Sequence, residues 1–175
     1  MIIRQEVEKD HETVFKLIEA AFRDMEMSDQ QEHFLAERLR LSDAFIPELS
    51  LVTIEHETII GHILLTRVSI VNEENVTPSL ALAPVSVLPE FQERGVGSAL
   101  IIESHKVAKD LGHDSIVLVG HPNFYPRFGY EPIHRYGISL PFDVPEEVSM
   151  IKDLSLGALN NVKGEVMYPR AFYGE

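Results

Sequence analysis

The sequence predicts a single α/β domain over residues 1–175, and three observations support this prediction. The length suits one domain and is enough to bury about 70% of the surface that the unfolded chain exposes. Short apolar stretches typical of strands alternate with segments in which apolar residues recur every three or four positions, as on one face of a helix. No internal repeat, low-complexity tract or linker divides the chain.

The first fifty residues predict one short strand followed by two helices. The strand is Ile2-Ile3, and Asp10 is placed to cap the first helix. The apolar residues of that helix follow the spacing i, i+3, i+4, i+7, i+8: Val14, Leu17, Ile18, Ala21 and Phe22. The second helix is expected to begin at Ser28 or Asp29, with Glu32 completing a capping box.

Further strands are expected along the rest of the chain: Leu51–Glu55, Ile59–Val71, Leu80–Val87, Ser115–Val119 and Gly164–Tyr168. A helix from about Glu93 to Leu111 separates the third of these from the fourth, and a strand–helix–strand unit with short loops predicts a parallel pair. Pro84 lies inside the third strand, where its missing N–H predicts a bulge or a local gap in pairing. Residues 133–159 are expected to be partly looped, with one short helix.

The composition argues against several classes of function. Lysine and arginine number 15 against 28 aspartates and glutamates, a net charge of −13, which disfavours nucleic acid or an anionic membrane as a partner and is compatible with cationic substrates. The chain has no cysteine, so disulfides, thiolate metal sites and a cysteine nucleophile are excluded. The histidines show no ligand pair, so no metal is expected. With neither a signal-peptide pattern nor an apolar run of membrane-spanning length, a cytoplasmic protein is expected.

The most informative segment follows the strand that ends at Val87. It reads Q-x-x-G-x-G from Gln92 to Gly97, where a strand passes into a helix whose N-terminal N–H groups suit an anion such as a phosphate. Arg94 and Ser98 add a charge and a hydroxyl. The alternative is that the two glycines only permit tight packing of the helix on the sheet. A P-loop lysine and the third glycine of the dinucleotide fingerprint are both missing.

With this motif the sequence resembles the Gcn5-related N-acetyltransferases (GNAT), including their small bacterial members. Gln92–Gly97 matches the acetyl-CoA motif of that family, and Asn123–Tyr130 resembles the segment in which a tyrosine precedes Gly-Phe/Tyr by four residues. The resemblance covers essentially the whole chain. It implies a mixed, largely antiparallel sheet with flanking helices, in which the parallel strands Leu80–Val87 and Ser115–Val119 splay apart from the bulge at Pro84.

The resemblance also implies where acetyl-CoA binds. The pantetheine arm would pair with the backbone of the first splayed strand, the amides of residues 93–98 would hold the pyrophosphate, and Asn123 would contact the cofactor. The cofactor-binding residues expected on this basis are Val85, Val87, Gln92, Glu93, Arg94, Gly95, Val96, Gly97, Ser98 and Asn123.

The implied reaction is transfer of the acetyl group to a primary amine of a small molecule or peptide, by direct attack in a ternary complex. Tyr125 occupies the family position of the general acid, and a phenol can hydrogen-bond the departing thiolate and protonate it. The alternative is that Tyr125 is an aromatic packing residue beside Phe124 and Phe128. His121 is the local candidate for the general base, while deprotonation through water and a substrate that arrives neutral stay open.

Other functions remain as alternatives. A non-catalytic acyl-CoA-binding sensor would keep the cofactor cleft without turnover. A nucleotide-binding protein using Gly95 and Gly97 would bind ATP or NAD instead of coenzyme A. The acceptor pocket is expected among the first two helices, the acidic connection at residues 23–31 and residues 133–159. A homodimer is expected only from the family resemblance.

Overall fold

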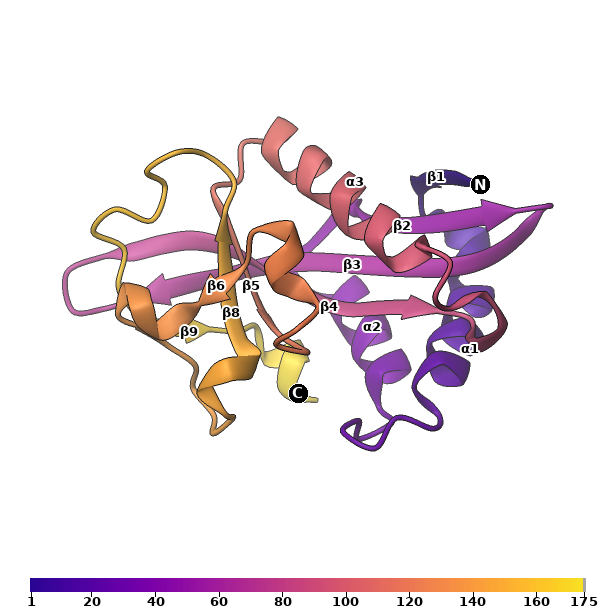
Figure 1. Cartoon of the computed structure of the whole chain (residues 1–175), viewed down its shortest axis with the longest axis horizontal. Helices are drawn as coiled ribbons and strands as arrows, with labels where there is room; N and C mark the ends of the chain where they lie inside the picture. The colour runs from indigo at the N-terminus through magenta and orange to yellow at the C-terminus, as the bar shows by residue number, and fades with distance from the viewer. Residues whose placement is uncertain (175) are drawn as a thin grey trace.

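The computed structural model describes residues 1–174 and shows a mixed sheet with helices on both faces (Figure 1). Its described strands are β1 (Ile2–Gln5), β2 (Phe45–Glu55), β3 (Thr58–Val71), β4 (Val76–Val87), β5 (Ser115–Val119), β6 (Glu131–Pro132), β7 (Ile138–Ser139), β8 (Ser149–Asp153) and β9 (Gly164–Met167). The described α-helices are α1 (His11–Phe22), α2 (Glu32–Arg40) and α3 (Val96–Asp110).

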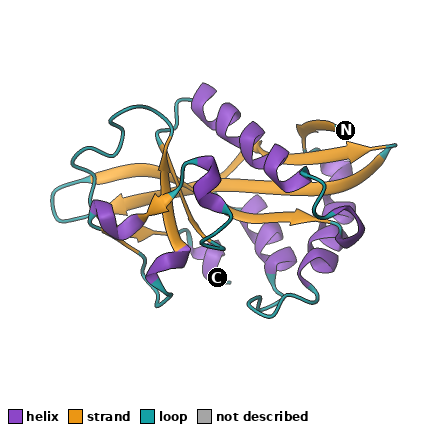
Figure 2. Cartoon of the chain, in the orientation of Figure 1, coloured by secondary structure: helices purple, strands orange, loops and turns teal. Residues whose placement is uncertain are grey.

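The strand order confirms the predicted mixed α/β class. The main path is β1-β2-β3-β4-β5-β8-β6, and β9 pairs with both β3 and β7. Figure 2 shows the long strands β2, β3 and β4 running side by side through the molecule. These pairs are antiparallel, β4 and β5 form the predicted parallel pair, and a second parallel contact of two residues joins β7 to β9.

Different helices cover the two faces of the sheet. Leu51 and Ile63 pack in the core beneath α3, whereas the residues that follow them, Val52 and Leu64, pack against α1 and α2. Because successive residues of a strand point to opposite faces, α3 covers one face and the two N-terminal helices cover the other (Figure 1).

The bulge predicted at Pro84 is present. Ile63 lies opposite Val85 and Leu65 lies opposite Leu82, so a single β3 residue faces the dipeptide Ala83-Pro84. β4 and β5 pair at two positions, Leu80–Ile116 and Ala81–Val117, both before the bulge. Across the described residues the two strands make no further ladder contacts, so they separate where the resemblance implies.

Two helices begin later than predicted, and local hydrogen bonds or backbone conformation explain each case. α2 begins at Glu32 because the turn before it is held by side chains: Asp29 accepts a hydrogen bond from the Gln31 N–H at 2.9 Å, and Ser28 accepts one from the Gln30 N–H at 2.8 Å. α3 begins at Val96, because the preceding residues include two in left-handed conformation.

Asp10 occupies the N-cap position of α1, but its side chain makes no capping hydrogen bond to that helix. Its carboxylate accepts hydrogen bonds from the Arg4 guanidinium at 2.7 and 3.0 Å and from the Val7 N–H at 2.8 Å. The residue therefore ties the start of the chain to the turn before α1, which differs from the predicted cap.

The region expected to be partly looped contributes a central strand. β8 pairs antiparallel with all five residues of β5, which places it inside the sheet. Its sequence, SMIKD, ends in two charged residues and has too few apolar residues to show the alternation of apolar and polar positions that is typical of a strand. None of the helices within residues 1–174 is long and apolar enough to cross a membrane.

Candidate active site

The loop between β4 and α3 leads into the N-terminus of the helix through two left-handed residues. Glu93 and Gly95 have φ of 63° and 82°, immediately before the helix. Left-handed residues in a turn can direct neighbouring N–H groups toward one point, and this loop, which we call the cradle, lies next to the positive end of the helix dipole. The Gln92 side chain donates a hydrogen bond to the Val87 carbonyl at 3.1 Å and ties the loop to the end of β4.

The two glycines of the motif are not the packing residues between helix and sheet. A Cβ built on Gly95 would meet no atom within 4 Å, and one on Gly97 would lie 3.8 Å from the Val87 side chain, an ordinary contact. The close approach occurs at Gly61 in β3, where a Cβ would lie 2.8 Å from Val96 and 3.0 Å from Leu100. The packing explanation therefore fits Gly61, and the open space at Gly95 and Gly97 supports a binding explanation.

A cavity of about 590 Å³ lies beside this loop. Its lining residues are Val87, Phe91, Gln92, Glu93, Gly95, Val96, Gly97, Ser98, Phe124 and Arg127. Most of the predicted cofactor residues are thus brought together, whereas Val85, Arg94 and Asn123 are absent from the lining. Arg94 instead lies over the Phe91 ring, 5.2 Å from its centroid.

Arg127 also lines this cavity, although it is not among the cofactor-binding residues expected from the sequence. Its guanidinium lies 4.8 Å from the centroid of the Phe124 ring, and both residues line the cavity. A cation between aromatic residues, inside the Asn123–Tyr130 segment of an otherwise acidic chain, was the signal available.

A second cavity, of about 460 Å³, lies where β4 and β5 separate. Its lining residues are Phe22, Met25, Glu32, Leu35, Leu82, Ala83, Pro84, Val85, Val119, Gly120, His121, Phe124 and Tyr125. Phe124 also lines the cavity beside the loop, so the two hollows adjoin. The arrangement brings the two predicted catalytic residues, Tyr125 and His121, to the same space as Val85.

Val85 and Val87 present their backbone groups to this gap. In an antiparallel ladder, alternate residues direct both N–H and C=O to the same neighbouring strand. The Leu88 N–H donates to the Ile60 carbonyl at 2.9 Å, so Leu88 and, two residues earlier, Ser86 face β3. Val87 and Val85 consequently face away from β3, toward the side on which β5 has separated.

Tyr125 is buried in a short 3-10 turn, Tyr125–Phe128, and faces the second cavity. Its ring packs edge-on against Phe124 and Tyr130, with centroids 5.1 and 5.8 Å away. Burial raises the pKa of the Tyr125 phenol to about 12, so the hydroxyl stays protonated at neutral pH. A Cβ on Gly120 would lie 2.8 Å from Tyr125 Cδ2, so the ring rests directly on the Gly120 backbone.

His121 is exposed at the mouth of the same cavity. Its Nδ1 accepts a hydrogen bond from the backbone N–H of Asn123 at 3.2 Å, which orients the imidazole. The predicted site residue Asn123 therefore contacts His121 through its backbone, and Asn123 is not among the residues that line either cavity.

Glu32 is a lining residue that the sequence reasoning treated only as part of a helix cap. It is the one carboxylate among the residues that line the second cavity. Its Oε1 accepts a hydrogen bond from the Ser28 hydroxyl, while its buried Oε2 has no hydrogen-bond partner among residues 1–174. No feature of the sequence distinguishes this glutamate from the other acidic residues nearby.

A protein-family model described as "Acetyltransferase (GNAT) domain" matches residues 2–133, more than half of the chain. The chain belongs to the GNAT acetyltransferase family. This finding confirms the family and the enzyme class that the two motifs indicate.

The relatives of this GNAT chain include YhbS of Escherichia coli, an uncharacterized N-acetyltransferase that is 25% identical over 172 residues, 98% of each protein. Another is the uncharacterized N-acetyltransferase YjhQ of the same organism, 36% identical over 102 residues, which are 58% of this chain and 56% of YjhQ.

Solved GNAT structures share the whole fold. YhbS from Escherichia coli in complex with CoA matches with a TM-score of 0.86 and 25% identity, covering 98% of this chain and 91% of that one. A GNAT acetyltransferase from Brucella melitensis in complex with acetyl-CoA matches with a TM-score of 0.80 and 30% identity, covering 98% and 97% of the two chains. These similarities confirm the predicted GNAT fold and agree with acetyl-CoA as the predicted cosubstrate.

Proposed function

We propose that this GNAT protein transfers the acetyl group of acetyl-CoA to a primary amine by direct attack in a ternary complex. The observation that carries the proposal is the pair of adjoining cavities, which share Phe124 as a lining residue and which together we call the groove. One cavity borders the loop at the start of α3, and the other is lined by the buried Tyr125. This arrangement suits a substrate with a pyrophosphate at one end and a thioester at the other.

The cradle supplies the contacts for the pyrophosphate. The N–H groups of residues 93–98 and the start of α3 favour negative charge, and Arg127 adds a cation beside them. Glycine at positions 95 and 97 lets an anion approach the backbone closely. These features support the predicted cofactor residues, with Arg127 added to them.

The separated edge of β4 supplies the contacts for the pantetheine arm. The outward-facing backbone of Val85 and Val87 can pair with its amides as a further strand would. An N–H of the same edge can donate to the thioester carbonyl, where negative charge develops as the amine attacks. Neither contact requires a particular side chain at these positions.

Tyr125 is the proposed general acid. Attack by the amine nitrogen forms the amide bond and breaks the C–S bond, and the sulfur leaves with the electron pair. A thiolate, whose acid has a pKa of about 8.5, accepts a hydrogen bond and then a proton from a donor held beside it. The protonated, buried Tyr125 hydroxyl lines the cavity where that sulfur would lie.

His121 is the proposed general base, because its imidazole lines the cavity. Its Nδ1 accepts the Asn123 N–H, so Nε2 carries the proton of the neutral ring, and Nδ1 can take the amine proton only once that hydrogen bond opens. Two other routes need no basic side chain: transfer of the proton to water, and binding of an amine that is already neutral. A His121→Gln variant separates the first route from the other two, because loss of a base lowers kcat/KM at neutral pH in a way that high pH restores by neutralising the free amine, whereas neither of the other routes uses the imidazole.

Release of the coenzyme A thiol in the presence of primary amines tests the proposed function. We expect thiol release to depend on the amine and to yield one acetylated amine for each thiol. The sensor alternative predicts that coenzyme A binds and that no amine of a broad panel is acetylated. Binding of ATP or NAD in place of coenzyme A would instead favour the nucleotide-binding alternative.

A further inference from the structure

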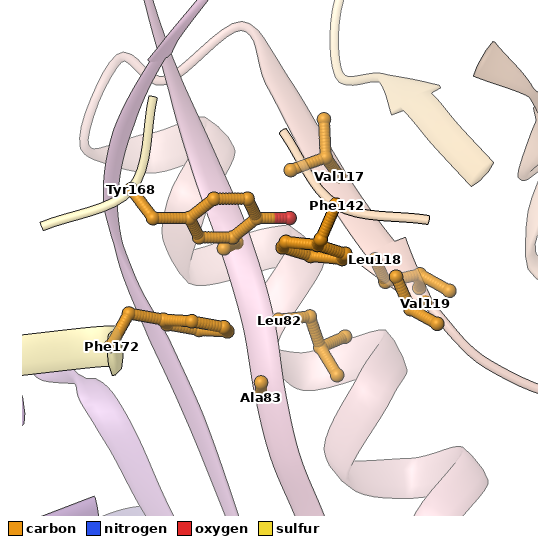
Figure 3. Close-up of a pocket in the computed structure, with 9 residues that line it drawn as sticks. Leu82, Ala83, Val117, Leu118, Val119, Phe142, Tyr168 and Phe172 are labelled. Atoms are coloured by element: carbon orange, nitrogen blue, oxygen red, sulfur yellow. The ribbon is translucent and has the colours of Figure 1, made fainter. Parts of the chain in front are cut away.

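A third cavity lies beside the separated strands β4 and β5, and Figure 3 shows its lining residues. Its volume is about 140 Å³, and its lining residues are Ala81, Leu82, Ala83, Val117, Leu118, Val119, Phe142, Tyr168 and Phe172. Ala81 and Val117 pack in one apolar cluster with Tyr168, whereas Leu82 and Leu118 pack in the core beneath α3. The aromatic wall therefore lies on the face of the sheet opposite α3.

The aromatic wall is assembled from two segments of the C-terminal region, one carrying Phe142 and the other Tyr168 and Phe172. Figure 3 shows the rings of Phe142, Tyr168 and Phe172 directed toward one another around the space. The Tyr168 ring lies 5.6 Å from Phe142 and 4.4 Å from Phe172, measured between centroids. The turn that carries Phe172 is fastened to α2, because Arg38 Nε donates to the Ala171 carbonyl at 2.8 Å.

This aromatic pocket opens next to the proposed acetyl-transfer site. Leu82, Ala83 and Val119 line both the aromatic pocket and the cavity that contains Tyr125. α2 adjoins both spaces as well, since Leu35 lines the Tyr125 cavity and packs in the same cluster as Phe172. A molecule whose amine reaches the thioester could therefore extend its other end among the three aromatic rings.

The size of the pocket indicates what it can hold. An apolar cavity of about 150 Å³ lined by Leu, Ile and Phe stays dry and accommodates a benzene molecule. The aromatic pocket has about 140 Å³ and an apolar lining, so a single ring or a short branched alkyl group would fill it. A polyamine or an aminoglycoside would leave hydrogen-bonding groups without partners there.

The charge of the adjoining cavity indicates the other end of the molecule. Glu32 is the sole carboxylate in its lining, and the Oε2 atom is buried without a partner among residues 1–174. An ammonium group in this cavity would be attracted to the Glu32 carboxylate, and a rotation of the side chain that turns Oε2 from its buried position toward the cavity would give that oxygen a charge-assisted hydrogen bond.

We infer that the acceptor is a primary amine bearing one aromatic ring, with the ring among Phe142, Tyr168 and Phe172 and the amine between Glu32 and Tyr125. The inference rests on the proposed function and names the acceptor class for it. The observation behind it is the juxtaposition of a ring-sized apolar pocket and the cavity that contains the Glu32 carboxylate, which share Leu82, Ala83 and Val119 as lining residues.

The test compares 2-phenylethylamine with ethylamine as acceptors at saturating acetyl-CoA. Burying the ring should raise kcat/KM for 2-phenylethylamine about 10- to 100-fold above that for ethylamine. In the Phe142→Ala variant the ratio of the two kcat/KM values should fall toward one, while the KM for acetyl-CoA is unchanged. Phe142→Leu keeps an apolar wall and serves if the alanine variant unfolds. Phe34→Ala, which removes a half-exposed ring outside these three linings, should behave as the wild type.

The ring and the charge are tested separately. The neutral analogue 2-phenylethanol should inhibit acetylation of ethylamine by competing for the same site. The Glu32→Gln substitution should weaken the binding of 2-phenylethylamine about tenfold and leave inhibition by 2-phenylethanol unchanged. Equal kcat/KM for the two amines, or a preference that survives in both Phe142 variants, would overturn the inference while the acetyltransferase activity stands. Use of benzoyl-CoA without a preference for 2-phenylethylamine would assign the pocket to the acyl group and overturn it as well.

Failure of catalysis is distinguished by direct binding. If neither amine is acetylated, the proposed function fails. Calorimetric titration of the coenzyme A complex with 2-phenylethylamine still shows whether the aromatic pocket binds the ring. Binding of 2-phenylethylamine that is lost in Phe142→Ala would support the pocket, and absence of binding to the wild type would contradict it.

Discussion

At the scale of single residues, the proposed chemistry depends on Tyr125 and on the glycine beneath its ring. The phenol is buried, faces the space between β4 and β5, and has a pKa raised to about 12 by burial. The motif in the sequence was sufficient to single out Tyr125. Gly120 could not be found in the same way, because its contribution is a close contact with the ring that arises only from the folded backbone.

Tyr125→Phe removes the hydroxyl and leaves the ring in its aromatic cluster. We expect kcat to fall about 100-fold or more, as is typical for loss of a general acid, with little change in the Kd of acetyl-CoA. Steady-state kinetics and calorimetry measure the two quantities. Tyr173→Phe, at an exposed tyrosine, is the matched control. A Tyr125→Phe variant with the kcat of the wild type would remove Tyr125 from the acid role.

Gly120→Ala tests the positioning of that ring. The added methyl group would lie 2.8 Å from Tyr125 Cδ2, so the ring must move, and kcat is expected to fall about tenfold or more. The decisive measurement is the double variant: in a Tyr125→Phe background, Gly120→Ala should cost much less than it does alone. Strictly multiplicative effects of the two substitutions on kcat would show that Gly120 acts independently of the Tyr125 hydroxyl.

At the scale of elements, the site is produced by the end of β4, the loop before α3 and the separation of β4 from β5. The Pro84 bulge and the parallel pair were predictable, because proline chemistry and strand–helix–strand order are local signals. β8 and the true start of α2 were not predictable. β8 is specified by pairing with the remote strand β5, and the start of α2 by side-chain hydrogen bonds of Ser28 and Asp29 that compete with helix.

Two glycine substitutions separate binding from packing in these elements. Gly97→Glu has room for its Cβ, which would lie 3.8 Å from Val87, so the protein should fold while its Kd for coenzyme A rises more than about tenfold through charge repulsion at the cradle. Gly61→Ala would place a Cβ 2.8 Å from Val96 and should lower the free energy of unfolding by about 1–3 kcal/mol.

Denaturant unfolding and calorimetry on both variants check this contrast. Normal coenzyme A affinity in a folded Gly97→Glu protein would contradict the cradle. An unchanged unfolding free energy in Gly61→Ala would contradict the assignment of the close helix–sheet contact to Gly61.

At the scale of the whole molecule, a buried histidine is expected to lower the stability of the fold in acid. His62 lies fully buried in β3, with Nε2 3.0 Å from Ser50 Oγ and 3.7 Å from the Glu6 carboxylate, which also binds Arg40. Burial lowers the pKa of His62 to about 4. The unfolded chain binds this proton below pH ~6.5 and the folded chain only near pH 4, so stability must fall as the pH drops between these values.

We expect this titration to remove on the order of 3 kcal/mol of unfolding free energy between pH 6.5 and 4, with no further contribution from His62 below that range. Denaturant unfolding at a series of pH values measures the slope. The His62→Gln substitution should reduce the slope of unfolding free energy against pH, whatever its effect on stability at pH 7. His134→Gln, at an exposed histidine, should leave that slope unchanged. An equally steep slope in His62→Gln would show that other groups dominate acid unfolding.

The whole molecule also shows how far the sequence leads. Two motifs indicated the family, the cosubstrate and the proposed acid, because they concern residues close together in the chain. The proposed acceptor site draws Glu32 from α2, Val119 from β5 and Phe142 from a distant loop, so only the fold brings these side chains together.

Titration with coenzyme A and acetyl-CoA, followed by thermal unfolding with ATP and NAD as comparison ligands, tests the central claim most directly. Binding to the folded state at 100 times the Kd stabilises a protein by about 2.7 kcal/mol, so a clear rise in Tm is expected with the two coenzyme A compounds alone. Loss of that rise in Gly97→Glu would locate it at the cradle. No stabilisation of the wild type by saturating coenzyme A would contradict the proposed groove and the reaction built on it.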